Sequence, residues 1–186
     1  MSASARDVHT IVRDTVLRLL HRDLTAAQRE VEAYPDDAAL WRVVPGISNS
    51  GGTLAMHLAG NLRHFIGATL GATEYARDRD AEFSVRGIPR AEVSRHLNDA
   101  MTQVTNTLRV LDPSTLDAVY PITVGTALTV RTDVYFVHLV AHASYHLGQI
   151  DYHRRIVTGN GATMETVSLS ALLGPLPDAA DRRSDV

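Results

Sequence analysis

Histidines at helical spacing are the residues in this chain whose types and positions suggest chemistry. His138, His142 and His146 follow one another at four-residue steps, and His57 lies in an apolar segment much earlier in the chain. Residues four apart lie on one side of an α-helix, one turn above each other, so two imidazoles at this spacing can bind one metal ion. The same pair could instead be one polar core residue and one solvated residue, and His57 could be a buried, hydrogen-bonded histidine.

Composition narrows the chemistry that the chain can perform. Cysteine is absent, which excludes disulfides, thiolate metal sites, iron–sulfur clusters and cysteine nucleophiles. All 18 basic residues are arginine, so a lysine Schiff base and a P-loop lysine are excluded as well. The formal charge of −3 provides no basic field that would attract nucleic acid, and no nucleic-acid partner is expected. A metal site in this chain must therefore use histidine and carboxylate.

The overall length and hydropathy pattern indicate one soluble domain. The 186 residues are 45% apolar and 21% charged, which is ordinary for a globular protein. The sequence contains no apolar run of about 18 residues and no signal-peptide core, so we expect no membrane contact and a cytoplasmic protein. The expected domain covers residues 1–174, and the polar residues 175–186 are expected to form a disordered tail.

Four long segments have the apolar periodicity of amphipathic helices, and these segments must position the histidines. They cover residues 6–34, 50–70, 89–111 and 132–157. His57 lies in the second of them, and the histidine pair lies in the last. The pattern predicts an all-α four-helix bundle with one long crossover, in which metal sites form from inward side chains on facing helices.

The connections between these helices have their own signatures. Residues 38–52 resemble a linker, and residues 71–88 are polar; we expect the latter connection at an end of the bundle. β-branched residues cluster between residues 116 and 131 on both sides of Gly125, which predicts a short β-hairpin before the last helix.

Two short motifs resemble the DinB-like superfamily of YfiT-like metalloenzymes. They are His57-Leu-Ala-Gly-Asn-Leu-Arg63 and His142-Ala-Ser-Tyr-His146-Leu-Gly-Gln149, and the segment 77–83 is similar to one branch of that superfamily. The resemblance covers residues 5–157 and implies that His57, His142 and His146 surround one metal ion. In the superfamily an arginine typically follows the histidine pair, whereas Leu147 stands in that place here. Three imidazoles leave a fourth tetrahedral position open, as reactive zinc sites do.

Several metals suit three imidazoles, and several nearby residues could support the ligands. Zinc is the first choice because imidazole suits it, and nickel, iron and manganese are compatible with the same ligands. Asn61 and His138 lie one helical turn from a predicted ligand and could orient it or contact substrate. Gln149 could form a hydrogen bond across the bundle. Arg63, and by position Arg131, could bind carboxylates of a co-substrate.

The resemblance also implies a function. Members of the superfamily include transferases and isomerases that use low-molecular-weight thiols such as mycothiol, bacillithiol or glutathione. We therefore expect a metal-dependent transferase that attaches such a thiol to an electrophilic small molecule, and by the same resemblance a homodimer. An arginine-only composition is typical of a GC-rich source, which favours mycothiol.

Three other functions are compatible with the sequence. A metal-dependent hydrolase would need a general base, yet no carboxylate is spaced near the histidines; Asp133 and Asp151 lie nine residues to either side of His142. A bundle that binds metal or a small molecule without catalysis is the second alternative. In the third, no metal binds and the histidines are structural.

Overall fold

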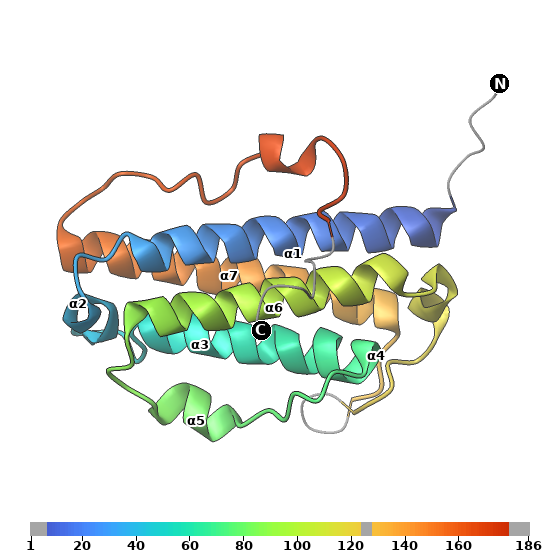
Figure 1. The fold of residues 1–186 in the computed structure, drawn as a ribbon, viewed down its shortest axis with the longest axis horizontal. Coiled ribbons are helices and arrows are strands. Elements are labelled where there is room, and N and C mark those ends of the chain that lie inside the picture. The colour runs from blue at the N-terminus through green and yellow to red at the C-terminus, as the bar shows by residue number, and fades with distance from the viewer. Residues whose placement is uncertain (1–6, 124–127, 179–186) are drawn as a thin grey trace, which may run out of the picture.

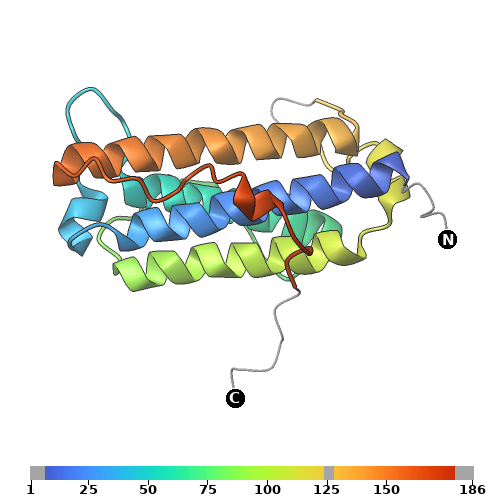
Figure 2. The same cartoon turned by 90° about the horizontal axis from the view of Figure 1, so that it is seen from above.

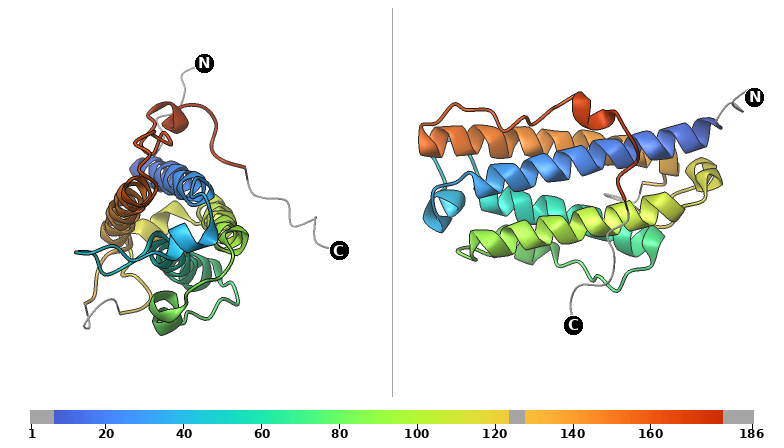
Figure 3. Two further views of the ribbon diagram at one scale, coloured as in Figure 1. Left: turned by 90° about the vertical axis from the view of Figure 1, so that its left-hand side faces the viewer. Right: turned by 45° about the horizontal axis from the view of Figure 1, so that its top comes forward.

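Four long helices form the body of the molecule, as seen along the bundle axis in the left panel of Figure 3. This computed structural model describes residues 7–123 and 128–178. α1 and α3 each pack against both α6 and α7, so α1 and α3 lie on one diagonal of the bundle. The predicted all-α four-helix bundle is therefore confirmed. The helices are α1 (Val8–Glu32), α3 (Gly51–Leu62), α6 (Arg90–Val110) and α7 (Thr132–Thr158) (Figure 1).

Capping residues set the ends of these helices close to the predicted positions. The Asp7 carboxylate accepts hydrogen bonds from the backbone amides of His9 and Thr10 at the start of α1. The Ser50 hydroxyl accepts from the amide of Thr53 at the start of α3. Gly159, at φ +66°, ends α7 in the left-handed conformation that glycine adopts without strain. None of the described helices has both the length and the apolar character that crossing a bilayer requires.

The second predicted helix is continuous but irregular beyond its histidine. α3 passes into a π-helical segment, η1 (Arg63–Ala68), and then into α4 (Thr69–Gly71). A π-helical turn changes the rotation of the residues that follow it, and such turns often occur at functional sites. This continuous helical stretch ends at Ala72, whose φ of +50° is in the left-handed region.

The long crossover runs along the bundle rather than at its end. α3 and α6 point in the same direction, so residues 72–89 must return along the length of the molecule (Figure 1). On the way they form α5 (Arg79–Ser84), which packs on α3. The expectation of a connection at the bundle end is therefore wrong, because two parallel helices cannot be joined by an end turn. The predicted linker 38–52 likewise begins within a short helix, α2 (Asp37–Trp41).

The predicted hairpin before the last helix is reduced to a single bridge in the described residues. After the 3₁₀ helix η2 (Pro113–Asp117), Val119 pairs antiparallel with Arg131. The amide of Tyr120 donates to the carbonyl oxygen of Val130 at 2.9 Å. Residues 124–127, which would form the turn, lie outside the described part of the chain.

The segment after α7 returns across α1 and carries the 3₁₀ helix η3 (Ser170–Leu172) (Figure 2). Arg154, 1% exposed, pairs with Glu30 and donates to the carbonyl oxygen of Ala162 at 2.7 Å, which holds the start of this segment. Arg18 donates to the carbonyl oxygen of Pro175 at 3.0 Å. Residues 179–186 of the expected tail lie outside the described residues, so the domain limits stay a prediction.

Candidate metal centre

Three imidazoles meet midway along the contact between α3 and α7. His57 from α3 and His142 and His146 from α7 each place one ring nitrogen within 4.8 Å of the others. His142 Nε2 lies 3.3 Å from His57 Nε2 and 3.0 Å from His146 Nε2. Two nitrogens bound to one tetrahedral zinc ion at about 2.0–2.1 Å are separated by about 3.4 Å. The structure thus brings the predicted triad together at a spacing that fits one ion.

A buried carboxylate orients His57. Glu82 of α5 is 4% exposed, and its Oε2 lies 2.9 Å from His57 Nδ1. Arg77 donates to both carboxylate oxygens, from Nε at 2.7 Å and from its terminal NH2 at 2.8 Å. An ionised carboxylate only accepts hydrogen bonds, so His57 carries its proton on Nδ1. The lone pair on His57 Nε2 is then directed at the centre of the triad.

The side chain of Gln149 orients the ring of His146 in the same way. The amide oxygen of Gln149 accepts a hydrogen bond from His146 Nδ1 at 2.8 Å, one helical turn along α7. His146 Nε2 therefore also presents a lone pair to the triad. His142 can donate one Nε2 proton to one of these two nitrogens but not to both. Its own Nδ1 is buried without a hydrogen-bond partner among the described residues. A cation at the centre would satisfy all three Nε2 atoms.

The electrostatic surroundings favour the protonation states that a metal site needs. Burial, followed by the neighbouring His146 and His57, lowers the pKa of His142 to about 3. Burial also lowers the pKa of His146. Burial alone would raise the pKa of Glu82, but hydrogen bonds from Arg77 and His57 outweigh it and hold that pKa below its ordinary value. At neutral pH the rings of His142 and His146 are therefore neutral and the carboxylate is ionised, which are the forms that bind and support a metal ion.

Glu82 and Arg77 belong to the segment 77–83 that carries part of the resemblance, but the sequence assigned neither of them a role at the site. The expectation that no carboxylate lies near the triad is wrong, because α5 brings Glu82 across a separation of 25 residues from His57. Gly60 is the residue in the sequence that could have indicated a close contact with another segment. Glycine inside a helix costs about 1 kcal/mol relative to alanine, which suggests a close approach at that position. A Cβ at Gly60 would overlap Glu82 Oε1.

The residues predicted to support the ligands lie along the same contact. Asn61 is 7% exposed, and its Oδ1 is buried without a partner in the described part of the chain. The exposed His138 ring stacks on Tyr135 at 5.7 Å between centroids and lies 6.0 Å from the ring of His142. Gln149 holds His146. Contact of Asn61 or His138 with substrate stays a prediction.

The predicted arginines and flanking aspartates lie elsewhere. Arg63 points toward α6, where its Nη1 lies 3.9 Å from Asp99 Oδ2. Its guanidinium also stacks over the ring of Tyr75, in the crossover, at 4.0 Å. Arg131 is exposed and pairs with Asp133 at 2.7 Å. Asp151 pairs with arginines of its own helix, at 2.8 Å for Arg155. None of these side chains has a recorded contact with the triad among the described residues, so binding of a co-substrate by Arg63 stays a prediction.

This helical bundle with a three-histidine cluster belongs to the family described as "Protein of unknown function (DUF1572)", whose model matches residues 10–170. The fold is similar to the crystal structure of the conserved protein of locus from Enterococcus faecalis, with a TM-score of 0.59. That similarity covers 84% of this chain and 100% of the other at 18% identity, which shows a shared fold alone. No curated protein matches the chain.

Replacing Gly60 by alanine should weaken zinc binding by about 10- to 100-fold, the usual effect of disturbing a group that orients a metal ligand. The added methyl group would displace Glu82 and free the ring of His57. A competitive chelator titration measures the affinity. Gly148→Ala is the matched control, because a Cβ at this position of α7 meets no atom within 4 Å. Equal affinities for Gly60→Ala and wild type would show that Glu82 does not support the site.

Lowering the pH should destabilise the chelator-treated protein. An unfolded histidine titrates near pH ~6.5, whereas the pKa of His142 in the folded protein is about 3. Between these values the unfolded chain binds more protons, so the free energy of unfolding falls as the pH falls from 6.5 toward 3. Urea unfolding at pH 7, 6 and 5 measures the slope, and His142→Gln should make it shallower. Other buried histidines, such as His153, are present in both proteins, so identical slopes would contradict this assignment.

Proposed function

We propose that this chain is a metal-dependent enzyme of the DinB-like type, which holds one divalent ion, preferably zinc, on His57, His142 and His146. One observation carries the proposal. Glu82 and Gln149 fix the tautomers of His57 and His146 so that two lone pairs converge on one point. A proton on His142 Nε2 can satisfy one of these lone pairs, whereas a cation between the rings satisfies all three nitrogens. The motif resemblance to the DinB-like superfamily supports the same assignment.

The activity that we propose is transfer of a low-molecular-weight thiol, of the mycothiol or bacillithiol kind, to an electrophilic small molecule. The ion would lower the pKa of the thiol and so supply a nucleophile at neutral pH. The chain contributes the orientation of the ligands, and Phe83 packs against the ring of His57 at 4.6 Å between centroids. Because the chain has no cysteine, the sulfur must arrive with the co-substrate. Such thiols stay reduced in the cytoplasm, where we place the protein.

Glu82 does not supply the general base that a metal-dependent hydrolase needs. A hydrolase needs a carboxylate or imidazole free to accept a proton from water. Glu82 approaches the triad, but His57 and Arg77 occupy both of its oxygens and its pKa is held below the ordinary value. Transfer of a thiol needs no such base, because the ion itself favours the thiolate. A non-catalytic metal or small-molecule binding bundle is the alternative that shares the same triad.

Metal content is the first test. The untagged protein should contain about one zinc or other divalent ion per chain by elemental mass spectrometry, and His142→Ala/His146→Ala should contain none. Removing two of three ligands leaves too few donors for a stable site. His96→Ala is the control, because His96 lies on α6 and outside the triad. Wild-type protein that remains metal-free after incubation with zinc, nickel and manganese would overturn the proposal.

Activity separates the enzyme from the binding bundle. The metal-loaded protein should accelerate the loss of mycothiol or bacillithiol in the presence of an electrophile such as 1-chloro-2,4-dinitrobenzene, and the double variant should not. A metal-loaded protein without activity against a panel of such electrophiles would support the non-catalytic alternative. Activity with ester or amide substrates and water alone would support the hydrolase.

We also propose a homodimer that forms through one face of α1 and α7. Exposed aliphatic side chains gather there, and an apolar groove between the two helices is lined by Ile11, Leu19, Val137 and Ala141. α7 is about 40 Å long and about 10 Å wide, and with half of α1 it presents roughly 600 Å² per copy. That area reaches the lower end of standard interfaces, and a second copy of the chain would cover it symmetrically. The exposed residues are Val8, Ile11, Val134 and Val137.

A charge on this face should prevent the pairing. Val137→Glu should sediment as a monomer at concentrations where the wild type sediments as a dimer, because the glutamate would lose its hydration in the interface. Val110→Glu is the control, since Val110 is 83% exposed on α6, away from this face. A monomeric wild type in analytical ultracentrifugation would contradict the proposal.

A further inference from the structure

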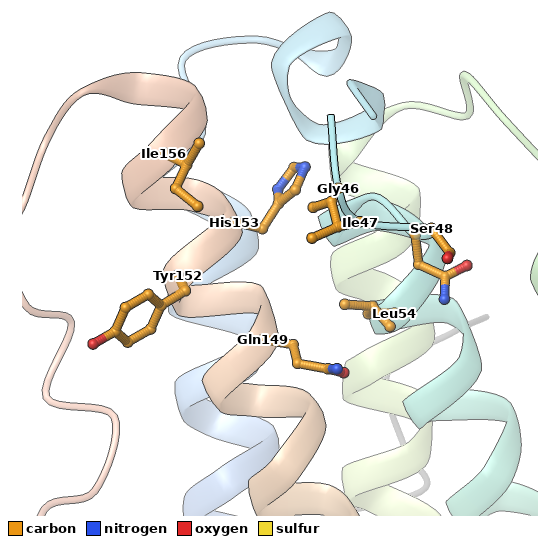
Figure 4. Close-up of a pocket in the computed structure, with 9 residues that line it drawn as sticks. Gly46, Ile47, Ser48, Leu54, Gln149, Tyr152, His153 and Ile156 are labelled. Atoms are coloured by element: carbon orange, nitrogen blue, oxygen red, sulfur yellow. The ribbon is translucent and has the colours of Figure 1, made fainter. Parts of the chain in front are cut away.

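A cavity of about 360 Å³ lies between α7 and the loop that precedes α3. Ile47, Leu54 and Ile156 line it with apolar atoms, and Ser48, Asn49 and Gln149 line it with polar ones (Figure 4). In Figure 4 the side chain of Gln149 extends from α7 toward Leu54 of α3. The volume is at the lower end of the range for small-molecule sites, about 300–1,000 Å³.

Gln149 joins this cavity to the triad. Its amide oxygen accepts the hydrogen bond of His146, and the same side chain forms part of the cavity wall. Its amide nitrogen has no recorded hydrogen bond among the described residues, so it remains a donor for a molecule in the cavity. A ligand that accepts this hydrogen bond would lie one side chain away from a ring of the triad.

The cavity is suited to an uncharged molecule. Its lining includes no aspartate, glutamate or arginine, and its one histidine, His153, is fully engaged. His153 Nδ1 lies 2.6 Å from the hydroxyl of Tyr34, and Nε2 lies 2.7 Å from the carbonyl oxygen of Arg42. Placing a carboxylate or phosphate in such a wall would remove it from water without a partner of opposite charge.

The loop that flanks the cavity is anchored where it begins. His153 binds the carbonyl oxygen of Arg42 at the start of the loop, and Trp41 Nε1 donates to the carbonyl oxygen of Ile88 at 2.8 Å. Gly46 turns the loop with φ +89°, and no atom lies within 4 Å of the position that a Cβ would take there. Anchoring one end of the loop reduces the cost of ordering it when a ligand binds.

We infer that this cavity is the subsite for the uncharged, apolar part of the organic substrate, with a carbonyl or similar acceptor of that substrate facing Gln149. The inference rests on the proposed function, because it takes the triad as the reacting centre. Ile47 and Ile156, 40% and 60% exposed, form the entrance, which explains two exposed aliphatic side chains from facing elements. Gln149 acts as a positioning residue for both His146 and the substrate.

The test uses acetanilide, an uncharged molecule with an aromatic ring and a carbonyl acceptor, and the chelator-treated full chain. In NMR titrations, acetanilide should shift the methyl signals of Ile47, Leu54 and Ile156 and the ring signals of His146, with a dissociation constant on the order of 1 mM. Benzoate, of similar size but charged, should bind at least about 10-fold more weakly. Ile156→Arg should weaken acetanilide binding by a similar factor, and Val110→Arg, at the last turn of α6, should leave it unchanged.

Three results would overturn the inference. They are acetanilide shifts that lie outside the cavity or do not occur, benzoate binding as strong as that of acetanilide, and unchanged binding in Ile156→Arg. Gln149→Leu separates positioning from simple packing: it should abolish the acetanilide-dependent shift of His146 while the cavity methyl signals still respond. Because the titration uses metal-free protein, failure of the triad to bind metal would appear only in the elemental analysis and would leave these results intact.

Discussion

The hydrogen bond between His57 and Glu82 is the contact on which the candidate site depends. It determines which nitrogen of His57 faces the triad, and it requires a carboxylate to be buried beside α3. A buried carboxylate is costly unless it is paired, and Arg77 provides that pair through two hydrogen bonds. The crossover can approach this closely only because residue 60 is glycine. The orientation of His57 therefore depends on the path of the crossover, on the pairing of Glu82 with Arg77, and on the absence of a side chain at Gly60.

The topology of the bundle explains why the crossover carries these groups. α3 and α6 are parallel, so the connecting residues must pass along the flank of α3. A connection of this length has room for α5, and α5 places Glu82 and Phe83 beside His57. The crossover is therefore part of the site as well as a link between helices. The fold shared with the Enterococcus faecalis protein extends over most of the chain, but at 18% identity it does not extend the comparison to these side chains.

The cavity, the triad and an aromatic cluster follow one another along α7 where it faces α3. The cavity beside Gln149 lies at one end, the triad lies in the middle, and the ring of His138 stacks on Tyr135 of the aromatic cluster at the other end. In that cluster Tyr135 contacts Phe65 and Tyr120, at 5.3 and 4.5 Å between ring centroids. The cavity and the triad share one residue, because Gln149 lines the cavity and also accepts the hydrogen bond of His146.

The sequence by itself determined the helices, the bundle and the three histidines. Periodicity and capping are local properties, so α1, α6 and α7 lie within a few residues of the predicted ranges, as does the continuous stretch of α3, η1 and α4. Two of the candidate ligands share one helix at a spacing that can be read directly from the sequence. Only the tertiary structure decided the rest. Glu82 and Arg77 reach the site through the path of the crossover, and Arg63 points to α6 because the helix rotates it away from His57. In the part of the hairpin that the structure describes, one bridge joins Val119 and Arg131. Each of these depends on how helices pack against one another, and neither spacing nor composition encodes that contact.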